Sequence, residues 1–581
     1  MSTTGVCITI VLAIAAFAGN WWWTDKSRHE FIRRVGDRVK APDILINHSK
    51  VFAKPEIIQV TPNIYCAFGY GLANSIMLEG DDGIVVVDVM ESYQVGQTVF
   101  KAFRQITKKP VKAIIYTHNH ADHTYGAKAF IEDPANPPEI WAHQSMLQEL
   151  QTWFYAMPIL MSRSIRQFGV LTPDHINSGI GSKLKLDRND NQLALVFPNK
   201  LFIGQERDIT IAGMNLKLVH IPGETSDQIG VWIADQKVFL SADDVYEAFP
   251  NLYAIRGTPS RSLLDWASSL DKIIDLAPEH LVPGHTRPLR GADAIADMLT
   301  CYRDAIQFVH DQTVRLMNKG YHPDEIAHMI KLPAHLANHP YLLEFYGTIE
   351  WSSKGVFNSY LGWFNGDPVD LSPFTPDELA EHIVHMGGGV DNMILKAKGA
   401  LHNNEYRWAL VLSSYILRID SNFREAKDIK AACLMALGNQ QISANGRNYF
   451  HTTAMETLGD VDVRPGPQSV AAFINNAPLR TVFDALRVHF DAEACLKVNI
   501  TIAWDFSKPT SHVSMKIRNA VVILRDRPAK THDMLVTVVE SVWRELLVNR
   551  FTKAASMSKD KFRVVGELSG LKKVMKCFDF N

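Results

Sequence analysis

The chain has 581 residues, of which 46% are hydrophobic and 21% are charged, as in ordinary soluble globular enzymes. This length is too great for one hydrophobic core and predicts about three domains. A formal net charge of −2 offers no general basic surface, so we expect no nucleic-acid partner. Six scattered cysteines without C-x-x-C spacing exclude a zinc knuckle or a dense disulfide framework, and leave one or two long-range bridges open.

The first 23 residues form either a signal peptide or a membrane anchor. Residues 5–19 are almost wholly apolar, and Ala16-Phe17-Ala18 fits a small-x-small cleavage site. Counted through Trp23, the segment has about 19 residues, enough to span a bilayer, and the basic residues follow it. We expect the secretory route and an extracellular protein, with membrane association through an anchor as the alternative.

Strand patterns alternate with helical patterns through residues 40–320. Strands are predicted over residues 75–78, 84–89, 111–116, 216–221, 238–240 and 280–282, and helices over residues 92–106, 144–151 and 262–276. Residues 80–83 are a hairpin turn signal. The alternation predicts a catalytic domain of the α/β class with two mixed sheets sandwiched between helices, an αββα architecture. Residues 157–185 are mixed in character, and are either an active-site lid or a structural excursion.

Histidine and aspartate gather directly after the strand predicted over residues 111–116. His118, His120, Asp122 and His123 form an H-x-H-x-D-H sequence there. The turn after a strand can aim alternate side chains at one point, so His118 and His120 are predicted to hold one divalent ion and Asp122 and His123 a neighbouring one. Imidazole and carboxylate are the ligands that zinc prefers when no thiolate is offered. The sequence therefore predicts a site for two metal ions.

Further candidates also follow predicted strands, at the edge where α/β sheets carry their sites. Glu224 and His285 each follow a Pro-Gly pair, and Asp243 follows the strand over residues 238–240. Asp88 either orients a ligand histidine or caps a loop. Arg256 comes a short loop after Asp243, and its planar fork of donors suits a sulfate monoester, which spreads one negative charge over three oxygens.

The order of these residues resembles the metallo-β-lactamase superfamily, whose signature is H-x-H-x-D-H, then P-G-H, a bridging Asp and a final His. Glu224 stands where the superfamily usually has His, and this replacement is a feature of its alkylsulfatases, which hydrolyse dodecyl sulfate. Residues 251–257 (NLYAIRG) resemble that family's NLxxLRG segment, and residues 360–368 resemble its YLGWFxGxP signature. The resemblance implies that Asn251 and Arg256 hold the sulfate.

The resemblance further implies a hydrolase that cleaves sulfate monoesters of long-chain or hydrophobic alcohols to the alcohol and inorganic sulfate. It implies two zinc ions per chain that share a bridging hydroxide. The implied zinc ligands are His118, His120, Asp122, His123, Glu224, Asp243 and His285. Family members often carry Glu at Asp243 and His at Arg261, so the metal bridge, the leaving-group acid and a catalytic role of Arg261 stay open. The alternatives are a thioester or lactone hydrolase with two zinc ions, and a lipid-binding protein with a vestigial metal site.

Helical patterns fill residues 321–455, and strands return in residues 456–581. Helices are predicted over residues 292–318, 323–330, 376–386, 391–417, 478–488 and 531–547, and strands over residues 496–506 and 512–524. The resemblance assigns the first region to an all-α dimerisation domain, so we expect a homodimer. It assigns the second region to an α+β sterol-carrier-protein-like domain with an apolar interior, for which a simple structural appendage is the alternative.

Overall fold

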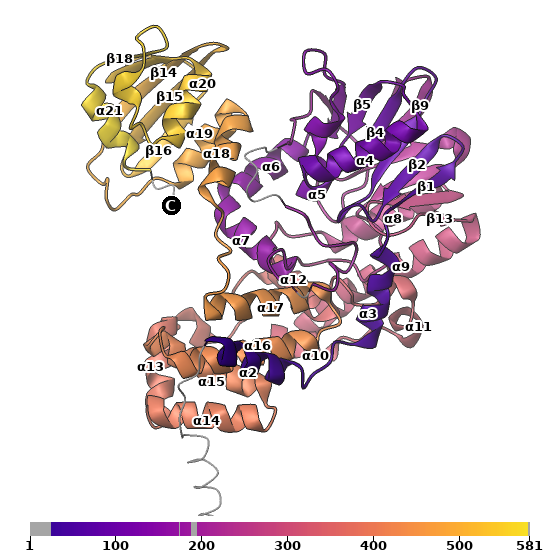
Figure 1. Ribbon diagram of the computed structural model, residues 1–581, viewed down its shortest axis with the longest axis vertical. Helices are drawn as coiled ribbons and strands as arrows, with labels where there is room; N and C mark the ends of the chain where they lie inside the picture. Colours follow the sequence, from indigo (N-terminus) through magenta and orange to yellow (C-terminus); the bar gives the residue numbers. More distant parts are fainter. Residues whose placement is uncertain (1–24, 174, 187–193, 579–581) are drawn as a thin grey trace, which may run out of the picture. The chain divides into compact units, whose positions relative to one another are not determined.

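The computed structural model describes residues 25–173, 175–186 and 194–578, which belong to two compact units (Figure 1). One unit comprises residues 48–170, 176–363 and 463–581, and the other comprises residues up to 47, residues 171–175 and residues 364–462. The predicted signal peptide or anchor, residues 1–23, lies outside the described residues. Among the described residues, no helix has both the length and the apolar character needed to cross a membrane.

Two sheets form a sandwich in the larger unit. The first sheet has seven strands in sequential order, and the second has six in the order β13-β12-β11-β10-β9-β8. The strands of the first sheet are β1 (Glu56–Thr61), β2 (Ile64–Phe68), β3 (Ser75–Glu79), β4 (Ile84–Val87), β5 (Val111–Ile115), β6 (Glu139–His143) and β7 (Lys200–Phe202). Those of the second are β8 (Glu206–Ile211), β9 (Met214–His220), β10 (Ile229–Ile233), β11 (Val238–Ala242), β12 (His280–Pro283) and β13 (Leu289–Arg290). Both sheets are mixed, because each combines antiparallel pairs with parallel ones.

Alternate residues of the central strands pack on opposite sides of the first sheet. Val85 and Ile115 join the core between the two sheets, together with Val231 of the second sheet. Val86 lies in the core on the outer face, where Val99 of α4 (Tyr93–Ile106) packs. Each such fully buried aliphatic side chain stabilises the fold by roughly 1.5–3 kcal/mol. This two-sided burial explains why the strands are continuously apolar.

Helices cover the outer faces of both sheets, which confirms the predicted αββα architecture (Figure 1). The helices α8 (Leu263–Asp275) and α9 (Ala292–Met317) share the core outside the second sheet. The side chain of Ser92 caps α4 by accepting the backbone N–H of Val95, and Ser262 caps α8 in the same way from Asp265. Further helices of this unit are α6 (Met146–Tyr155), α7 (Met157–Gln167), α10 (Pro323–Met329) and α12 (Ile349–Leu361).

The smaller unit is helical in its described residues, but one predicted helix is two helices. Its helices are α2 (Asp25–Gly36), α13 (Pro376–Met386), α14 (Val390–His402), α15 (Tyr406–Ile419), α16 (Arg424–Asn439) and α17 (Ala444–Leu458). The helix predicted over residues 391–417 is interrupted between α14 and α15, where Asn404 has a φ of 62°. Asn tolerates this left-handed conformation better than most residues, and a helix cannot continue through it. The predicted domain boundaries at residues 320 and 455 stay predictions.

The C-terminal domain is α+β, as predicted. A five-stranded sheet has the order β16-β15-β14-β17-β18, and a disulfide joins Cys495 to Cys577 with their Cα atoms 5.9 Å apart. The strands are β14 (Ile500–Ser507), β15 (Thr510–Arg518), β16 (Val521–Arg525), β17 (Met534–Val538) and β18 (Phe562–Val565), and the helices are α18 (Pro467–Asn476), α19 (Leu479–Val488), α20 (Glu540–Val548) and α21 (Leu568–Met575).

Two sequence predictions in this domain are wrong in detail. The strand predicted over residues 512–524 is a hairpin of β15 and β16, because Asn519 and Ala520 both adopt left-handed conformations, with φ of 52° and 58°. The helix predicted over residues 531–547 is strand β17 followed by helix α20. Its β-branched first half pairs with β14 and β18, so sheet pairing overrides the helical periodicity.

Candidate active site

The predicted metal ligands converge from the ends of three strands. His118 and His120 lie on the turn after β5, and Asp122 and His123 lie on the short helix α5 (Ala121–Thr124) that follows. Asp243 and His285 follow β11 and β12, which run parallel and therefore end at the same edge of the second sheet. The potential ligand atoms form two groups, in each of which the atoms lie within 4.8 Å of one another. We name them the His118 triad (His118, His120 and Asp243) and the Asp122 triad (Asp122, His123 and His285).

The Asp243 carboxylate lies between the two triads. Its Oδ2 is 3.7 Å from His118 Nε2 and 3.1 Å from His285 Nε2, and its Oδ1 is 3.3 Å from His123 Nε2. Burial alone would raise the pKa of Asp243, but the nearby histidine charges hold it well below the usual value. The short aspartate side chain therefore reaches both triads, which is the position required of a bridging ligand.

The imidazoles of the Asp122 triad are oriented by hydrogen bonds on their far side. His123 Nδ1 lies 2.7 Å from Asp88 Oδ2, and His285 Nδ1 lies 2.8 Å from the carbonyl oxygen of Leu72. Thr117 fixes Asp88 in turn through its backbone N–H and its hydroxyl group, at 2.9 and 2.8 Å. Each ring thus presents Nε2 to the site, and the predicted contact between Asp88 and a site histidine is confirmed.

The imidazoles of the His118 triad face each other directly. His118 Nε2 lies 2.8 Å from His120 Nδ1. Burial, and then the charges of neighbouring imidazole and guanidinium groups, lower the pKa of both rings well below the usual value. Both rings are therefore neutral near pH 7, the form in which imidazole binds a metal ion.

Glu224 is brought to the edge of the site, where it pairs with Arg261. Arg261 Nη1 lies 2.8 Å from Glu224 Oε1, and both side chains are 2% exposed. Arg261 also donates to the carbonyl oxygen of Asn251. Burial raises the pKa of Glu224 to about 7, against the attraction of Arg261. Glu224 is in neither triad, so its role as a metal ligand stays a prediction.

The Pro-Gly pairs before Glu224 and His285 are explained by close packing. A Cβ on Gly223 would lie 2.0 Å from Asp244 Oδ1, and a Cβ on Gly284 would lie 2.3 Å from Asp243 Oδ1. Sequence reasoning missed Asp244, whose Oδ1 accepts a hydrogen bond from the backbone N–H of Glu224 at 3.4 Å. The available signal was its position in the Asp-Asp pair that directly follows β11.

Backbone strain surrounds the same residues. Asp88, Ala242 and Thr286 have φ values of 59°, 49° and 66°, in the left-handed region that favours glycine. Ala242 directly precedes Asp243, and Thr286 directly follows His285. Each such residue costs about 1–3 kcal/mol, so the surrounding fold must enforce these conformations. Strain of this kind is common at functional sites. Here it lies directly beside the predicted metal ligands Asp243 and His285.

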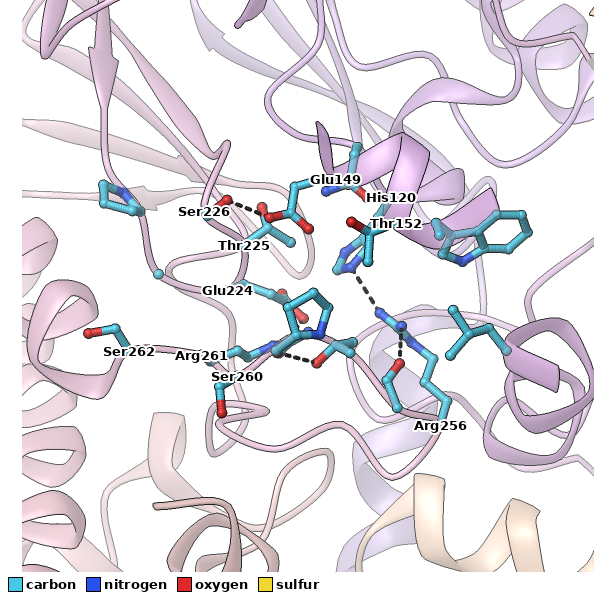
Figure 2. Close-up of a pocket in the computed structure, with 18 of the residues that line it drawn as sticks. His120, Glu149, Thr152, Glu224, Thr225, Ser226, Arg256, Ser260, Arg261 and Ser262 are labelled. Atoms are coloured by element: carbon cyan, nitrogen blue, oxygen red, sulfur yellow. Dashed lines mark hydrogen bonds and ion pairs between the residues drawn. The ribbon is translucent and has the colours of Figure 1, made fainter. Parts of the chain in front are cut away.

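A cavity of about 240 Å³ opens beside the triads (Figure 2). His120, Glu224, Arg256 and Arg261 supply polar walls. Arg256 Nη2 lies 2.8 Å from His120 Nε2, and the backbone N–H of Arg256 donates to Gln167 Oε1 at 3.0 Å. The predicted excursion over residues 157–185 thus begins with a helix, α7, that supports the Arg256 loop.

The remaining cavity wall is partly apolar, and Asn251 lies outside it. Trp153 of α6 and Leu160 of α7 line the cavity. Asn251 is 1% exposed, and its side-chain amide has no hydrogen-bond partner among the described residues. The structure therefore brings Arg256 to the cavity as predicted, whereas Asn251 is buried beside it, behind the Arg261 contact.

The side chains present fit two divalent cations. His123 Nε2, Asp243 Oδ1 and Glu224 Oε2 are buried, and none has a hydrogen-bond partner within the described part of the chain. Unpartnered buried nitrogen and oxygen atoms are costly, and metal ions bound beside these atoms would satisfy them. Neutral imidazoles and carboxylates are also the donor set of zinc sites without thiolate.

The αββα sandwich with paired triads at its strand ends defines the class of a metallo-β-lactamase-fold hydrolase. Residues 69–285 match the family model of the metallo-beta-lactamase superfamily, residues 322–460 match that of alkyl sulfatase dimerisation, and residues 467–581 match that of the alkyl sulfatase C-terminal domain. The chain belongs to the alkylsulfatase family.

Similar proteins span almost the whole chain. A linear primary-alkylsulfatase from Pseudomonas sp. is 33% identical over 87% of this chain and 98% of its own length. An alkyl/aryl-sulfatase from Saccharomyces cerevisiae is 26% identical over 90% of this chain and 82% of its own length. The solved structure of a stereoselective inverting sec-alkylsulfatase from Pseudomonas sp. superposes with a TM-score of 0.85 at 25% identity, covering 92% of this chain and 86% of that one.

Proposed function

We propose that this enzyme hydrolyses sulfate monoesters of long-chain or other hydrophobic alcohols to the alcohol and inorganic sulfate, with two zinc ions per chain. The observation that carries the proposal is the cavity in which Arg256 and His120 meet beside both triads. Relatives named as alkylsulfatases over most of the chain support the same reaction.

The residues divide into a metal end and a substrate end. His118, His120, Asp122, His123, Asp243, His285 and, by the resemblance, Glu224 would hold the ions. Zinc bound there supplies Lewis acidity and lowers the pKa of a water molecule to about 7, so that no strong protein base is needed. Asp88 keeps His123 in one tautomer, and Asp243 holds the two halves of the site in register.

At the substrate end, Arg256 binds the sulfate and the apolar wall binds the alcohol. The Arg256 guanidinium offers a planar fork of donors to two sulfate oxygens. Trp153 and Leu160 contact the hydrocarbon and keep bulk water away from the reacting group. The Arg261 guanidinium supplies a second positive charge to the wall of the cavity.

Sulfate release from dodecyl sulfate, measured together with the zinc content, tests this function. We expect sulfate release with about two zinc ions per chain, and a large loss in Arg256→Met. Arg207→Met is the matched control, because Arg207 is exposed on β8 and outside the cavity. Zinc-loaded protein that hydrolyses a thioester but releases no sulfate would contradict the proposal.

We further propose that the chain forms a homodimer through its helical unit. Large apolar side chains are exposed there, including Val369 at 74%, Met386 at 77% and Trp408 at 54%. Packing of a second copy on these side chains would remove them from water, and residues 322–460 match the family model of alkyl sulfatase dimerisation. Sedimentation should give a dimer for the wild type and for the control Glu381→Gln on α13, and a monomer for Met386→Glu with Trp408→Glu. A dimer that survives both substitutions would place the interface elsewhere.

We also propose that the protein enters the secretory route. The Cys495–Cys577 disulfide supports the secretory route, because such bonds persist in oxidising compartments. N-terminal sequencing should find a chain cut after Ala18, whereas an intact N-terminus in a membrane fraction would favour the anchor.

The aromatic core of the C-terminal domain, with Phe483, Trp504 and Trp543, supports a sterol-carrier-like affinity for hydrocarbon chains. Quenching of tryptophan fluorescence in the full chain by a long-chain alcohol tests it, and no response would favour a structural appendage.

A further inference from the structure

One loop sends two arginines into the same cavity. Arg256 and Arg261 lie on the segment between β11 and α8 and are 7% and 8% exposed. Figure 2 shows Arg261 beside Glu224 and Arg256 beside His120, on opposite sides of the cavity. The Arg256 guanidinium already supplies what the proposed sulfate monoester needs, which is one positive charge and a fork of donors. The Arg261 guanidinium therefore adds a second positive charge that a singly charged sulfate monoester does not need.

The Arg261 side chain has donors to spare. Its Nη1 contacts Glu224 and the Asn251 carbonyl group, but Nε and Nη2 are buried without a hydrogen-bond partner among the described residues. The neighbouring Asn251 amide is unpartnered as well. Buried guanidinium donors are costly when unsatisfied. An acceptor with several oxygens, placed in the cavity that Arg261 lines, would satisfy the two Arg261 donors together.

The charge of Arg261 becomes available when the metal centre is loaded. In the structure it is balanced by Glu224, which the family resemblance assigns to a metal ion. A carboxylate shared with a divalent cation neutralises the arginine only in part. Charges interact strongly in a buried site, so a second negative charge on the bound anion is then favoured over a single one.

We propose that Arg261 makes this cavity a receptor for a dianionic tetrahedral oxyanion. The ligand class comprises inorganic sulfate, which the reaction releases, and phosphate monoesters in their dianionic form. Arg261 is then a specificity residue that retains the product and favours dianions over monoanions of the same shape. This inference rests on the proposed function, because it requires the two-metal site to be loaded.

Equilibrium binding to the zinc-loaded full chain tests the inference. Perchlorate and sulfate share a tetrahedral shape but carry one and two charges, and phenyl phosphate is dianionic at about pH 8, since its second pKa is about 6. Calorimetry should show sulfate or phenyl phosphate binding at least about 10-fold more tightly than perchlorate. Tight sulfate alone identifies the product as the ligand, and tight phenyl phosphate alone identifies a phosphate monoester. Equal affinity for all three anions in the wild type overturns the proposal.

Variants assign the preference to Arg261. Arg261→Met should reduce the ratio of sulfate to perchlorate affinity by at least about 5-fold, whereas Arg207→Met should keep the wild-type ratio. Arg261→Lys keeps the charge but loses the fork, so it should keep the preference for dianions with weaker affinity, and it decides the matter if Arg261→Met does not fold. An unchanged sulfate affinity in Arg261→Lys together with an unchanged ratio in Arg261→Met overturns the assignment.

Failure of this inference is distinct from failure of the proposed function. Zinc content and sulfate release from dodecyl sulfate are measured on the same preparation. Two zinc ions and sulfatase activity with no preference for dianions overturn the role of Arg261 alone. Absence of zinc or of sulfatase activity overturns the proposed function, and the receptor for dianions with it.

Discussion

The two triads of the candidate metal centre hold their imidazoles in different ways. In the Asp122 triad, His123 and His285 are each fixed from behind, by Asp88 and by the Leu72 carbonyl group. Their Nε2 atoms therefore point into the site before any ion arrives. This half of the centre is preorganised, as expected of a position that binds a metal ion tightly.

In the His118 triad, His118 Nε2 lies 2.8 Å from His120 Nδ1, and Glu224, a further predicted metal ligand, pairs with Arg261. An ion must separate the rings and compete with a guanidinium for the carboxylate. The H-x-H-x-D-H sequence thus contributes to two metal positions that differ in how far their ligands are preorganised. We therefore expect the first zinc ion to occupy the Asp122 triad and the second to bind more weakly.

Removing the residue that both triads share has the largest expected effect. Asp243→Ala should reduce sulfate release to below about one-thousandth of the wild-type rate, because without the ions the pKa of the attacking water is no longer lowered towards neutrality. Elemental analysis should show less than one zinc ion per chain. Asp208→Ala, an exposed aspartate on β8, should behave as the wild type. Two zinc ions retained by Asp243→Ala would contradict the shared position.

Removing the sulfate-binding group separates substrate binding from metal binding. Arg256→Met should lower kcat/KM for dodecyl sulfate by about 10²–10³-fold, because a donor to the developing charge is lost. Its zinc content should equal that of the wild type, because Arg256 contacts the Nε2 atom of His120, whereas it is the Nδ1 atom of His120 that lies next to His118. Loss of zinc in this variant would show that Arg256 supports the His118 triad instead.

Weakening the hydrogen bond between Asp88 and His123 should lower the zinc affinity of the Asp122 triad. Asp88→Asn keeps the size of the side chain but removes the charge that orients His123. Zinc affinity at the tight position should fall by about 10–100-fold. Competition with a chelator of known affinity measures both sites. If only the weak site changed, the order of the two positions would be reversed.

Substitution of Glu224, which pairs with Arg261, has the smallest expected effect on zinc binding. Glu224→Gln should lower the affinity of the weak zinc site by less than about 10-fold, because Arg261 already draws this carboxylate away. The same competition assay applies, with Asp122→Asn as the comparison in the other triad. A larger loss in Glu224→Gln than in Asp122→Asn would show that Glu224 is a principal ligand and that its pairing with Arg261 is secondary.

The sequence allowed prediction of site residues that directly follow a recognisable strand. It did not allow prediction of contacts between residues that the fold brings together from different loops. The H-x-H-x-D-H residues, Asp243 and His285 could be predicted, because each directly follows an apolar strand that could be recognised from its pattern. The pairing of Glu224 with Arg261 could not, since the two belong to different loops that only the second sheet brings together. Asp244 was missed because its place in the Asp-Asp pair was the only signal, and that place does not show that the side chain is buried.

The elements predicted wrongly show the same division. Residues 391–417 and 512–524 have continuous helical and strand patterns, and the breaks depend on one or two residues in left-handed conformations. Residues 534–538 became a strand because β14 and β18 were available to pair with them. Local pattern thus predicted which segments are buried, whereas tertiary pairing decided where each element begins and ends.

Sulfate release from dodecyl sulfate, followed while zinc is added stepwise to metal-free protein, tests whether two unequal metal positions support the reaction. We expect little release after the first equivalent, which fills the Asp122 triad, and a rise to full activity with the second. Full activity without metal, or no sulfate at any zinc content, would contradict it.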